Sequence, residues 1–422
     1  MSISLEMGVM NNLINIQHLQ SITAIIKFGS ISKAADVAHL SQSAVSQSLQ
    51  KLERQLKGKL FTRGAKGVIP TPLGIVFIGR IEQALLRLQL MESVVAKENV
   101  SHHFQRYLTG SQLAALIHVV AQGSFRRAAQ QLNLTQPTIH RAVSNLESLV
   151  GQKLFSRSAF GVEPTWQARQ LARHGGLFLR EIENAYEVAQ SLMGSHSGKL
   201  VIGALPLARS TMIPVAVTQL LQTYPKAQIQ IIDGPYDEQF KGLLRGSIDV
   251  IVGALRDASQ HYEIQQSILF TEPLNIVVKQ GHSLFQHQGR LSAYLLAELD
   301  WVAPRHNTPA RLAFNDFFKR EGLVIPEHVI ECSSLVAIRG LLMNSNRAAI
   351  LPARQVELEV ASSQLAVLPY PLVGTERSIG VTTLRGWQPT EIQSRFVALL
   401  HERQGNNQHT KPNHMSDSFF WP

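Results

Sequence analysis

The stretch LSQSAVSQSLQKLERQLKGKLFTR, residues 40–63, returns later in the chain as LTQPTIHRAVSNLESLVGQKLFSR, residues 134–157. The two copies lie 94 residues apart and align without a gap. The match also extends upstream, where Gly29–Ser30 corresponds to Gly123–Ser124. Because equivalent residues keep the same spacing throughout, the sequence predicts two compact units that share one backbone plan.

Each copy has the pattern of three short helices. In the first copy, apolar residues at helical spacing precede a short helix predicted from Ile31 to Ala38. Ser41 is placed to cap a third helix, from about Gln42 to Leu56. In the second copy, Thr135 is the corresponding cap of a helix from about Gln136 to Val150. Two short helices around a tight connection are typical of a helix-turn-helix, whose second helix enters the DNA major groove.

The third helix of each copy carries polar side chains of the kind that read base edges. A basic segment follows it and is predicted to form a hairpin, or wing, whose cations lie near phosphate. The candidate DNA contacts are Ser41, Gln42, Ser43, Ser46, Gln47, Lys51 and Arg63 in the first copy, and Thr135, Gln136, Thr138, His140, Arg141, Asn145 and Arg157 in the second.

The first copy, followed by PTPLG at residues 70–74, resembles the N-terminal winged helix-turn-helix of the LysR-type transcriptional regulators. The second copy resembles the same module again. This chain departs from the family in carrying the module twice. Lys57 also stands where the family usually has a glycine, whereas the second copy keeps Gly151. The resemblance implies two DNA-binding domains, at residues 15–74 and 109–166.

A helix-turn-helix also serves some proteins as an interaction module, and this alternative stays open for one of the two copies. Charge favours nucleic acid. The net charge is +10, and residues 1–196 hold 20 Lys and Arg against 11 Asp and Glu, whereas residues 197–422 hold 20 against 19. A basic half suits the phosphates of double-stranded DNA and predicts binding that weakens as salt rises. Weak binding to any DNA would instead favour a co-regulator without DNA contacts.

A linker helix is predicted after each copy, within residues 75–98 and 167–195. Both carry apolar stripes at the spacing that paired helices bury. In the resembling family a helix in this place forms the dimer contact, but a helix that packs on its own domain within the chain is the alternative. With two such helices, one can pair within the chain and the other between chains. The resemblance implies a homodimer or tetramer, and a dimer would then present four DNA-binding units.

From residue 198 to 404 predicted strands and helices alternate, which favours a parallel sheet with helices on its faces. The segments GKLVIGALP, residues 198–206, and LLRGSIDVIVGA, residues 243–254, resemble the effector-binding part of the same family. The expected fold is multidomain: two all-α winged helix-turn-helix domains precede a two-lobed α/β domain like the periplasmic binding proteins. Lobe one is expected at about 198–270 and 375–404, lobe two at about 271–374, and a disordered tail at 405–422.

The resemblance places a small-molecule effector in the cleft between the lobes. In open α/β sheets, ligands bind beyond the carboxyl ends of strands, near helix N-termini that favour anions. An organic or sugar acid is therefore the expected class of effector. Several of these residues have the alternative role of plain helix caps or surface ion pairs. The candidates are Pro206, Arg209, Ser210, Thr211, Arg305, Asn307, Thr308, Ser333 and Ser334.

No motif supports an enzyme, a metal site or a cofactor, because HExxH, GxSxG and GxGxxG are all missing from the sequence. The single cysteine, Cys332, excludes an internal disulfide and fits a reducing compartment. Neither a secretory signal nor a membrane-spanning segment is recognisable. The sequence therefore predicts a cytoplasmic, sequence-specific DNA-binding regulator controlled by an effector, which would contact RNA polymerase if it is an activator.

Overall fold

The computed structural model describes residues 16–64, 67–95, 104–159, 161–259, 262–286, 291–306 and 308–408. The predicted lead-in before Asn15, residues 96–98 of the first linker, Asn307 and the tail from residue 409 lie outside this range. The chain forms two compact units. The first runs to Lys199 and includes Lys241–Ile248, and the second contains Leu200–Phe240 and the residues from Asp249 onward.

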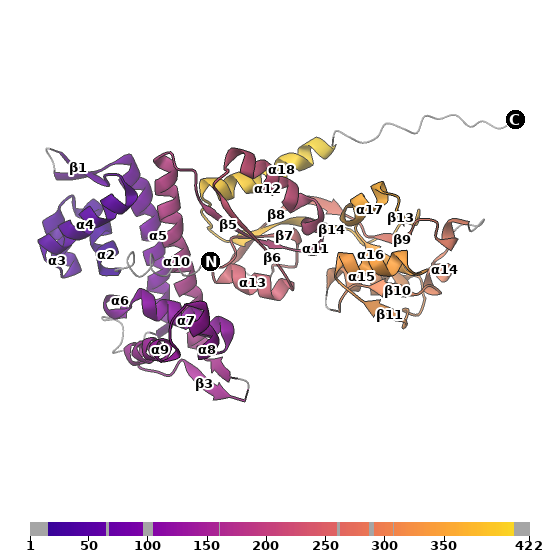
Figure 1. Cartoon of the computed structure of the whole chain (residues 1–422), viewed down its shortest axis with the longest axis horizontal. Helices are drawn as coiled ribbons and strands as arrows, with labels where there is room; N and C mark the ends of the chain where they lie inside the picture. The colour runs from indigo at the N-terminus through magenta and orange to yellow at the C-terminus, as the bar shows by residue number, and fades with distance from the viewer. Residues whose placement is uncertain are drawn as a thin grey trace. The chain divides into compact units, whose positions relative to one another are not determined.

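The first unit contains both copies of the repeat (Figure 1). Each has three helices followed by an antiparallel hairpin. The expectation that both domains are all-α is therefore wrong. The first copy consists of α2 (Ile16–Phe28), α3 (Ile31–Ala38), α4 (Gln42–Leu56), β1 (Phe61–Gly64) and β2 (Gly67–Pro70). The second consists of α7 (Gly110–Gln122), α8 (Phe125–Gln131), α9 (Gln136–Val150), β3 (Phe155–Ser158) and β4 (Gly161–Pro164), preceded by α6 (Phe104–Tyr107).

The predicted helix caps are confirmed. The Ala44 N–H donates to Oγ of Ser41 (3.1 Å) at the start of α4, and the Thr138 N–H donates to Oγ1 of Thr135 (3.4 Å) at the start of α9. The two third helices also end alike, although their terminal residues differ. Lys57 follows α4 with φ +54°, and Gly151 follows α9 with φ +68°. Lys57 therefore adopts the left-handed conformation that Gly151 reaches without steric cost.

The two linker helices pack against each other within the chain. They are α5 (Pro72–Val95) and α10 (Trp166–Leu192), and Figure 1 shows them side by side. The rings of Phe77 and Tyr186 lie 5.4 Å apart between centroids, and Arg80 lies 3.6 Å from Glu181. The residue numbers of these contacts increase along α5 while they decrease along α10, so the two helices are antiparallel. Each linker helix therefore packs mainly against the linker helix of the other copy, rather than on its own domain as the alternative had it.

The second unit contains two mixed five-stranded sheets. The first has the strand order β6-β5-β7-β14-β8, with α12 and α18 packed together beside it. Its elements are β5 (Lys199–Ala204), α11 (Pro206–Ser210), α12 (Met212–Thr223), β6 (Gln228–Asp233), α13 (Tyr236–Leu244), β7 (Val250–Ala254), β8 (Ile264–Glu272), β14 (Arg377–Leu384) and α18 (Glu391–Gln408).

The second sheet has the strand order β11-β10-β12-β9-β13. Both of its faces are covered, because Trp301 and Ala303 of β10 lie in one apolar core and Val302 lies in another. Its elements are β9 (Asn275–Lys279), η1 (Ser283–Gln286), α14 (Ala293–Ala297), β10 (Trp301–Ala303), α15 (Pro309–Arg320), β11 (Val329–Glu331), α16 (Leu335–Met343), β12 (Ala348–Leu351), η2 (Ala353–Val356), α17 (Glu357–Ala361) and β13 (Leu365–Val367).

Three details differ from the sequence-based expectation. The sequence did not predict β8 or β13, which pair antiparallel with β14 and β9. Both sheets are mixed rather than parallel, because β14 also runs antiparallel to β7 and β9 runs antiparallel to β12. The predicted disorder from Gly405 is wrong for residues 405–408, because α18 continues to Gln408. Residues 241–248 also belong to the first unit, where Gly176 of α10 lies against the backbone of Arg245.

Candidate nucleic-acid interface

The helices α4 and α9 each bury one face and expose the other. In α4 the buried face consists of Val45, Leu49, Leu52 and Leu56, with Glu53 beside them. The candidate contacts lie on the opposite side. Gln42, Ser43, Gln47 and Lys51 are exposed and Ser46 is half-buried, while on α9 Gln136, Thr138, His140, Arg141 and Asn145 are all exposed. Both helices therefore offer a polar face that a DNA groove can accept.

The first turn of each helix is held by hydroxyl groups. Oγ of Ser41 lies 3.0 Å from Oγ of Ser43, and Oγ1 of Thr135 lies 2.8 Å from Oγ1 of Thr138. These side chains, predicted as DNA contacts, thus also fix the helix start. Beyond the capped groups, the first-turn N–H groups of an α-helix have no intrahelical acceptor and suit a phosphate oxygen.

The exposed faces differ most at the centre of the helix. His140 stacks on the ring of Phe125 at 3.9 Å between centroids, and its Nε2 lies 3.4 Å from Nε2 of Gln136. The equivalent residues in the first copy are Ser46 and Ile31, which cannot form such a stack. The exposed face of α9 therefore carries a large side chain stacked on an aromatic ring, whereas the exposed face of α4 carries a small hydroxyl side chain at the same position.

A largely buried glutamate connects each third helix to its hairpin, a role that the sequence analysis missed. Glu53 accepts hydrogen bonds from the Leu60 N–H (2.9 Å) and from Nζ of Lys59 (2.7 Å). Glu147 does the same in the second copy, with the Leu154 N–H at 2.8 Å and Nζ of Lys153 at 2.7 Å. The signal was present in the sequence, because Leu–Glu and Lys–Leu–Phe recur together in both copies.

The hairpins are also anchored to the first helix of their own copy. The Val68 N–H donates to the Gly29 carbonyl (3.0 Å), and the Val162 N–H donates to the Gly123 carbonyl (3.1 Å). Gly67, with φ +116°, has no room for a side chain, since a Cβ there would lie 2.6 Å from the Gly29 oxygen. This close approach fixes the two strands that carry Arg63 and Arg157, and both arginines are exposed.

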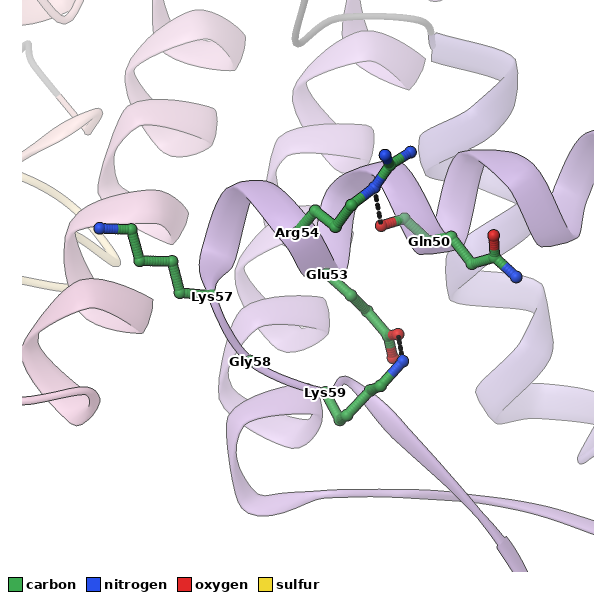
Figure 2. A pocket seen from close by; sticks show the side chains of 6 residues that line it. All are labelled: Gln50, Glu53, Arg54, Lys57, Gly58 and Lys59. Atoms are coloured by element: carbon green, nitrogen blue, oxygen red, sulfur yellow. Dashed lines mark hydrogen bonds and ion pairs between the residues drawn. The ribbon is translucent and has the colours of Figure 1, made fainter.

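A basic surface pocket of about 580 Å³ lies where α4 meets its hairpin (Figure 2). It is lined by Gln50, Glu53, Arg54, Lys57, Gly58 and Lys59. Lys59 pairs with Glu53, whereas Figure 2 shows the Lys57 ammonium pointing away from that carboxylate. The pocket lining therefore carries three cations and one carboxylate, and this net positive charge attracts an anion such as a backbone phosphate.

The candidate effector residues fall into two groups on different sheets. Pro206, Arg209, Ser210 and Thr211 follow β5 of the first sheet. Nη1 of Arg209 lies 3.2 Å from Oδ2 of Asp233, so this cation is paired. Oγ of Ser210 is buried and has no hydrogen-bond partner among the described residues. Ser210 does not cap α12, so its alternative role as a plain helix cap is wrong.

The second group meets at one edge of the second sheet. Arg305 and Thr308 follow β10, and Ser333 and Ser334 follow its parallel neighbour β11. Thr308 caps α15 and Ser334 caps α16, so Ser333 is not the cap that the sequence allowed. A backbone hydrogen bond from the Cys332 N–H to the Ala303 carbonyl (3.0 Å), at the ends of the two strands, holds these segments together.

Among the described residues, three or more His, Cys, Asp or Glu side chains are nowhere grouped closely enough to hold a metal ion. No described helix combines the length and the apolar character needed to cross a membrane.

Comparison with family models identifies both halves of the chain. The model for the bacterial regulatory helix-turn-helix protein, lysR family, matches residues 16–75 and again residues 111–169. The model for the LysR substrate binding domain matches residues 193–405. The matched stretches correspond to the two repeat copies and to the sheet-containing part.

Full-length relatives agree with this assignment. The HTH-type transcriptional regulator GalR of Pseudomonas putida is 29% identical over 390 residues, which cover 92% of this chain and 97% of the relative. The uncharacterized HTH-type transcriptional regulator YdcI of Escherichia coli is 28% identical and covers 66% of this chain and 91% of its own. A full-length OxyR variant from Pseudomonas aeruginosa shares the fold, with 21% identity, a TM-score of 0.53 and coverage of 71% and 95%. Because family models match most of its length, the chain belongs to the LysR family and is a DNA-binding transcriptional regulator with an effector-binding domain, not an enzyme.

Proposed function

We propose that both copies are winged helix-turn-helix domains that bind double-stranded DNA, with bounds at 15–74 and 109–166. The observation that carries this proposal is the repeated arrangement of α4 and α9. Each helix is capped by a hydroxyl, exposes a polar face and is joined through a buried glutamate to a hairpin that bears an arginine. Because both copies have this arrangement and a basic residue on the hairpin, we infer that both bind DNA.

The residue roles follow from position and chemistry. Gln42 and Gln136 occupy equivalent places in the first helical turn, where an amide can bind adenine through two hydrogen bonds. Arg63 and Arg157, at equivalent places on the hairpins, are proposed to bind phosphate. The pocket around Arg54 and Lys57 offers a further phosphate position. Base discrimination is therefore assigned to the helices, and salt-dependent affinity mostly to the hairpins.

The effector is proposed to bind between the two sheets of the second unit. Ser210 supports this proposal, because a buried hydroxyl without a partner costs free energy that a ligand hydrogen bond would recover. Arg305 is exposed at the edge of the other sheet and is available to a carboxylate. An organic or sugar acid fits these groups. Thr308 and Ser334 are weaker candidates, since both cap helices.

Regulation requires that the effector favour one arrangement of the protein on DNA over another. We propose that effector binding changes the placement of the DNA-binding domains within a homo-oligomer in the cytoplasm. As an activator the protein would also contact RNA polymerase. The free energy available for the switch is limited to the difference in effector affinity between the two arrangements.

The proposal is tested by selecting DNA from a random library, followed by footprinting at moderate salt. The intact chain is compared with Gln42→Ala/Ser46→Ala, with Gln136→Ala/Arg141→Ala, and with the control Gln89→Ala on the exposed side of α5. We expect each double variant to lose a different part of the protected site and the control to lose none. If only one double variant matters, the other copy is an assembly module. If the intact chain selects no sequence, the proposal is wrong.

A further inference from the structure

We propose that α5 and α10 are a mutually specific pair, so that one chain presents both of its DNA readers as a single unit. The target of that unit is a DNA duplex with two different half-sites, bound by one chain. This inference rests on the proposed function of the two copies. It concerns which helices pair and what kind of DNA the pair selects.

The contacts between the helices fix their register. Phe77 meets Tyr186 and Arg80 meets Glu181, while Gly175 lies opposite Met91, whose Cε would be 3.6 Å from an added Cβ. Most residues that are buried on α5 have a buried counterpart on α10, 94 residues later in the sequence. A single interface therefore joins equivalent faces of two non-identical helices.

Charge makes this interface selective. Arg80 and Glu181 are only 10% and 15% exposed, so neither charge is well solvated. The residue of α5 that corresponds to Glu181 is Arg87. If the α5 helices of two chains paired in the same register, Arg80 would face Arg87 across a largely buried interface. Two like charges there disfavour pairing between chains, which is how specificity is commonly achieved.

Side-chain size points the same way. Ala84 and Phe178 occupy equivalent positions, are fully buried, and lie between the contacts made by Arg80 and Met91 on α5 and by Gly175 and Glu181 on α10. The register thus sets Ala84 opposite Phe178. Two α5 helices would bring alanine against alanine and leave a void, whereas two α10 helices would bring phenylalanine against phenylalanine. A pair of two α5 helices or of two α10 helices would therefore pack less favourably than the pair of α5 with α10.

The antiparallel pair also determines what the readers see. The first copy precedes the start of α5 and the second precedes the start of α10, so they lie at opposite ends of the pair (Figure 1). Their reading faces match at Gln42 and Gln136 but differ at Ser46 and His140, and at Gln47 and Arg141. Different donor and acceptor groups select different bases. The preferred duplex should therefore contain two unlike half-sites at one fixed spacing.

The test uses the full chain and duplexes recovered by selection from a random library. For the intact protein we expect one pair of unlike half-sites for each chain bound, and at least about tenfold weaker binding when five base pairs, half a helical turn, separate the two half-sites further. Ala84→Phe and Phe178→Ala should each weaken this spacing preference, and the double variant Ala84→Phe/Phe178→Ala should restore it. The exposed substitution Glu82→Ala is the control.

Co-expression of the two single variants separates pairing within a chain from pairing between chains. The inference predicts that the mixture stays defective, because neither chain holds a complementary pair. Rescue by mixing, a separate chain for each half-site, or a double variant that fails to recover would each overturn the inference while leaving DNA binding intact. If the intact chain selects no sequence, the proposed function fails instead.

Discussion

The two copies of the repeat have the same framework and different exposed faces on their third helices, the faces proposed to read DNA. Both use a hydroxyl cap, a buried glutamate and a hairpin bonded to the first helix, with distances that agree within about 0.3 Å. The residues at the centre of α4 and α9 differ, and only the second copy stacks a histidine on a phenylalanine. The comparison indicates that the fold requires the framework residues and leaves the reading face free to vary.

The largest expected effect comes from the interface that joins the copies. Glu181→Arg would place a fourth cation beside Arg80, Arg87 and Arg180, whose charges all act on this site. We expect the free energy of unfolding to fall by about 3–5 kcal/mol, as for other broken buried ion pairs. Urea denaturation measures the loss, with the exposed Glu82→Arg as control. Equal stability of the two variants would contradict the described interface.

The next effect tests the shared framework. Glu53→Ala removes the acceptor of the buried Leu60 N–H, and Glu147→Ala removes that of the Leu154 N–H. An unsatisfied buried donor costs about 1–3 kcal/mol, and we expect the larger loss for Glu53, which is 7% exposed against 11% for Glu147. Hydrogen exchange at these two amides reports each copy separately. Unchanged exchange at both amides would show that the glutamates do not hold the hairpins.

A smaller effect tests a framework position where the copies differ in backbone cost. Lys57 has a left-handed backbone that suits glycine, as at Gly151. Lys57→Gly should relieve that strain and raise the free energy of unfolding by up to about 1 kcal/mol, partly offset by the greater freedom of the unfolded chain. Gly151→Ala should lower stability by a similar amount. Chemical denaturation measures both, and a destabilised Lys57→Gly would refute the strain.

The smallest effect is a pH dependence that belongs to the interface alone. Burial raises the pKa of Glu181 despite the opposing charge of Arg80, so the folded protein holds a proton there more tightly than the unfolded chain. This contribution to stability is full below the unfolded pKa and is lost as the pH rises through the higher folded pKa. Glu181→Gln should flatten the pH profile of unfolding in that window. A steeper profile in the variant would contradict the direction of the shift.

Local patterns predicted much of the fold. The repeat, the caps at Ser41 and Thr135 and the bounds of α4 and α9 follow from residue spacing and capping chemistry, which act over a few residues. The buried role of Glu53 did not follow, because its acceptor function depends on a hairpin that folds back onto the helix. The strands β8 and β13 were missed for a similar reason, since their pairing partners lie far away in the sequence.

The partner of each linker helix was the least predictable feature. An apolar stripe predicts that a helix is buried but does not identify what covers it. The choice of α10 as the partner of α5 depends on individual contacts, such as Arg80 with Glu181, that the register brings together. The candidate effector residues show the same limit: Ser334 rather than Ser333 caps α16, and the buried hydroxyl of Ser210 is apparent only in three dimensions.

The central claim is that one framework carries two different readers. The most direct test transplants the second reading face onto the first copy, by Ile31→Phe together with Ser46→His, Gln47→Arg and Lys51→Asn. DNA is then selected from a random library with the transplanted and the intact chain. The account predicts that the two halves of the selected site become alike, each matching the half-site of the second copy. A selected site identical to that of the intact chain would contradict it.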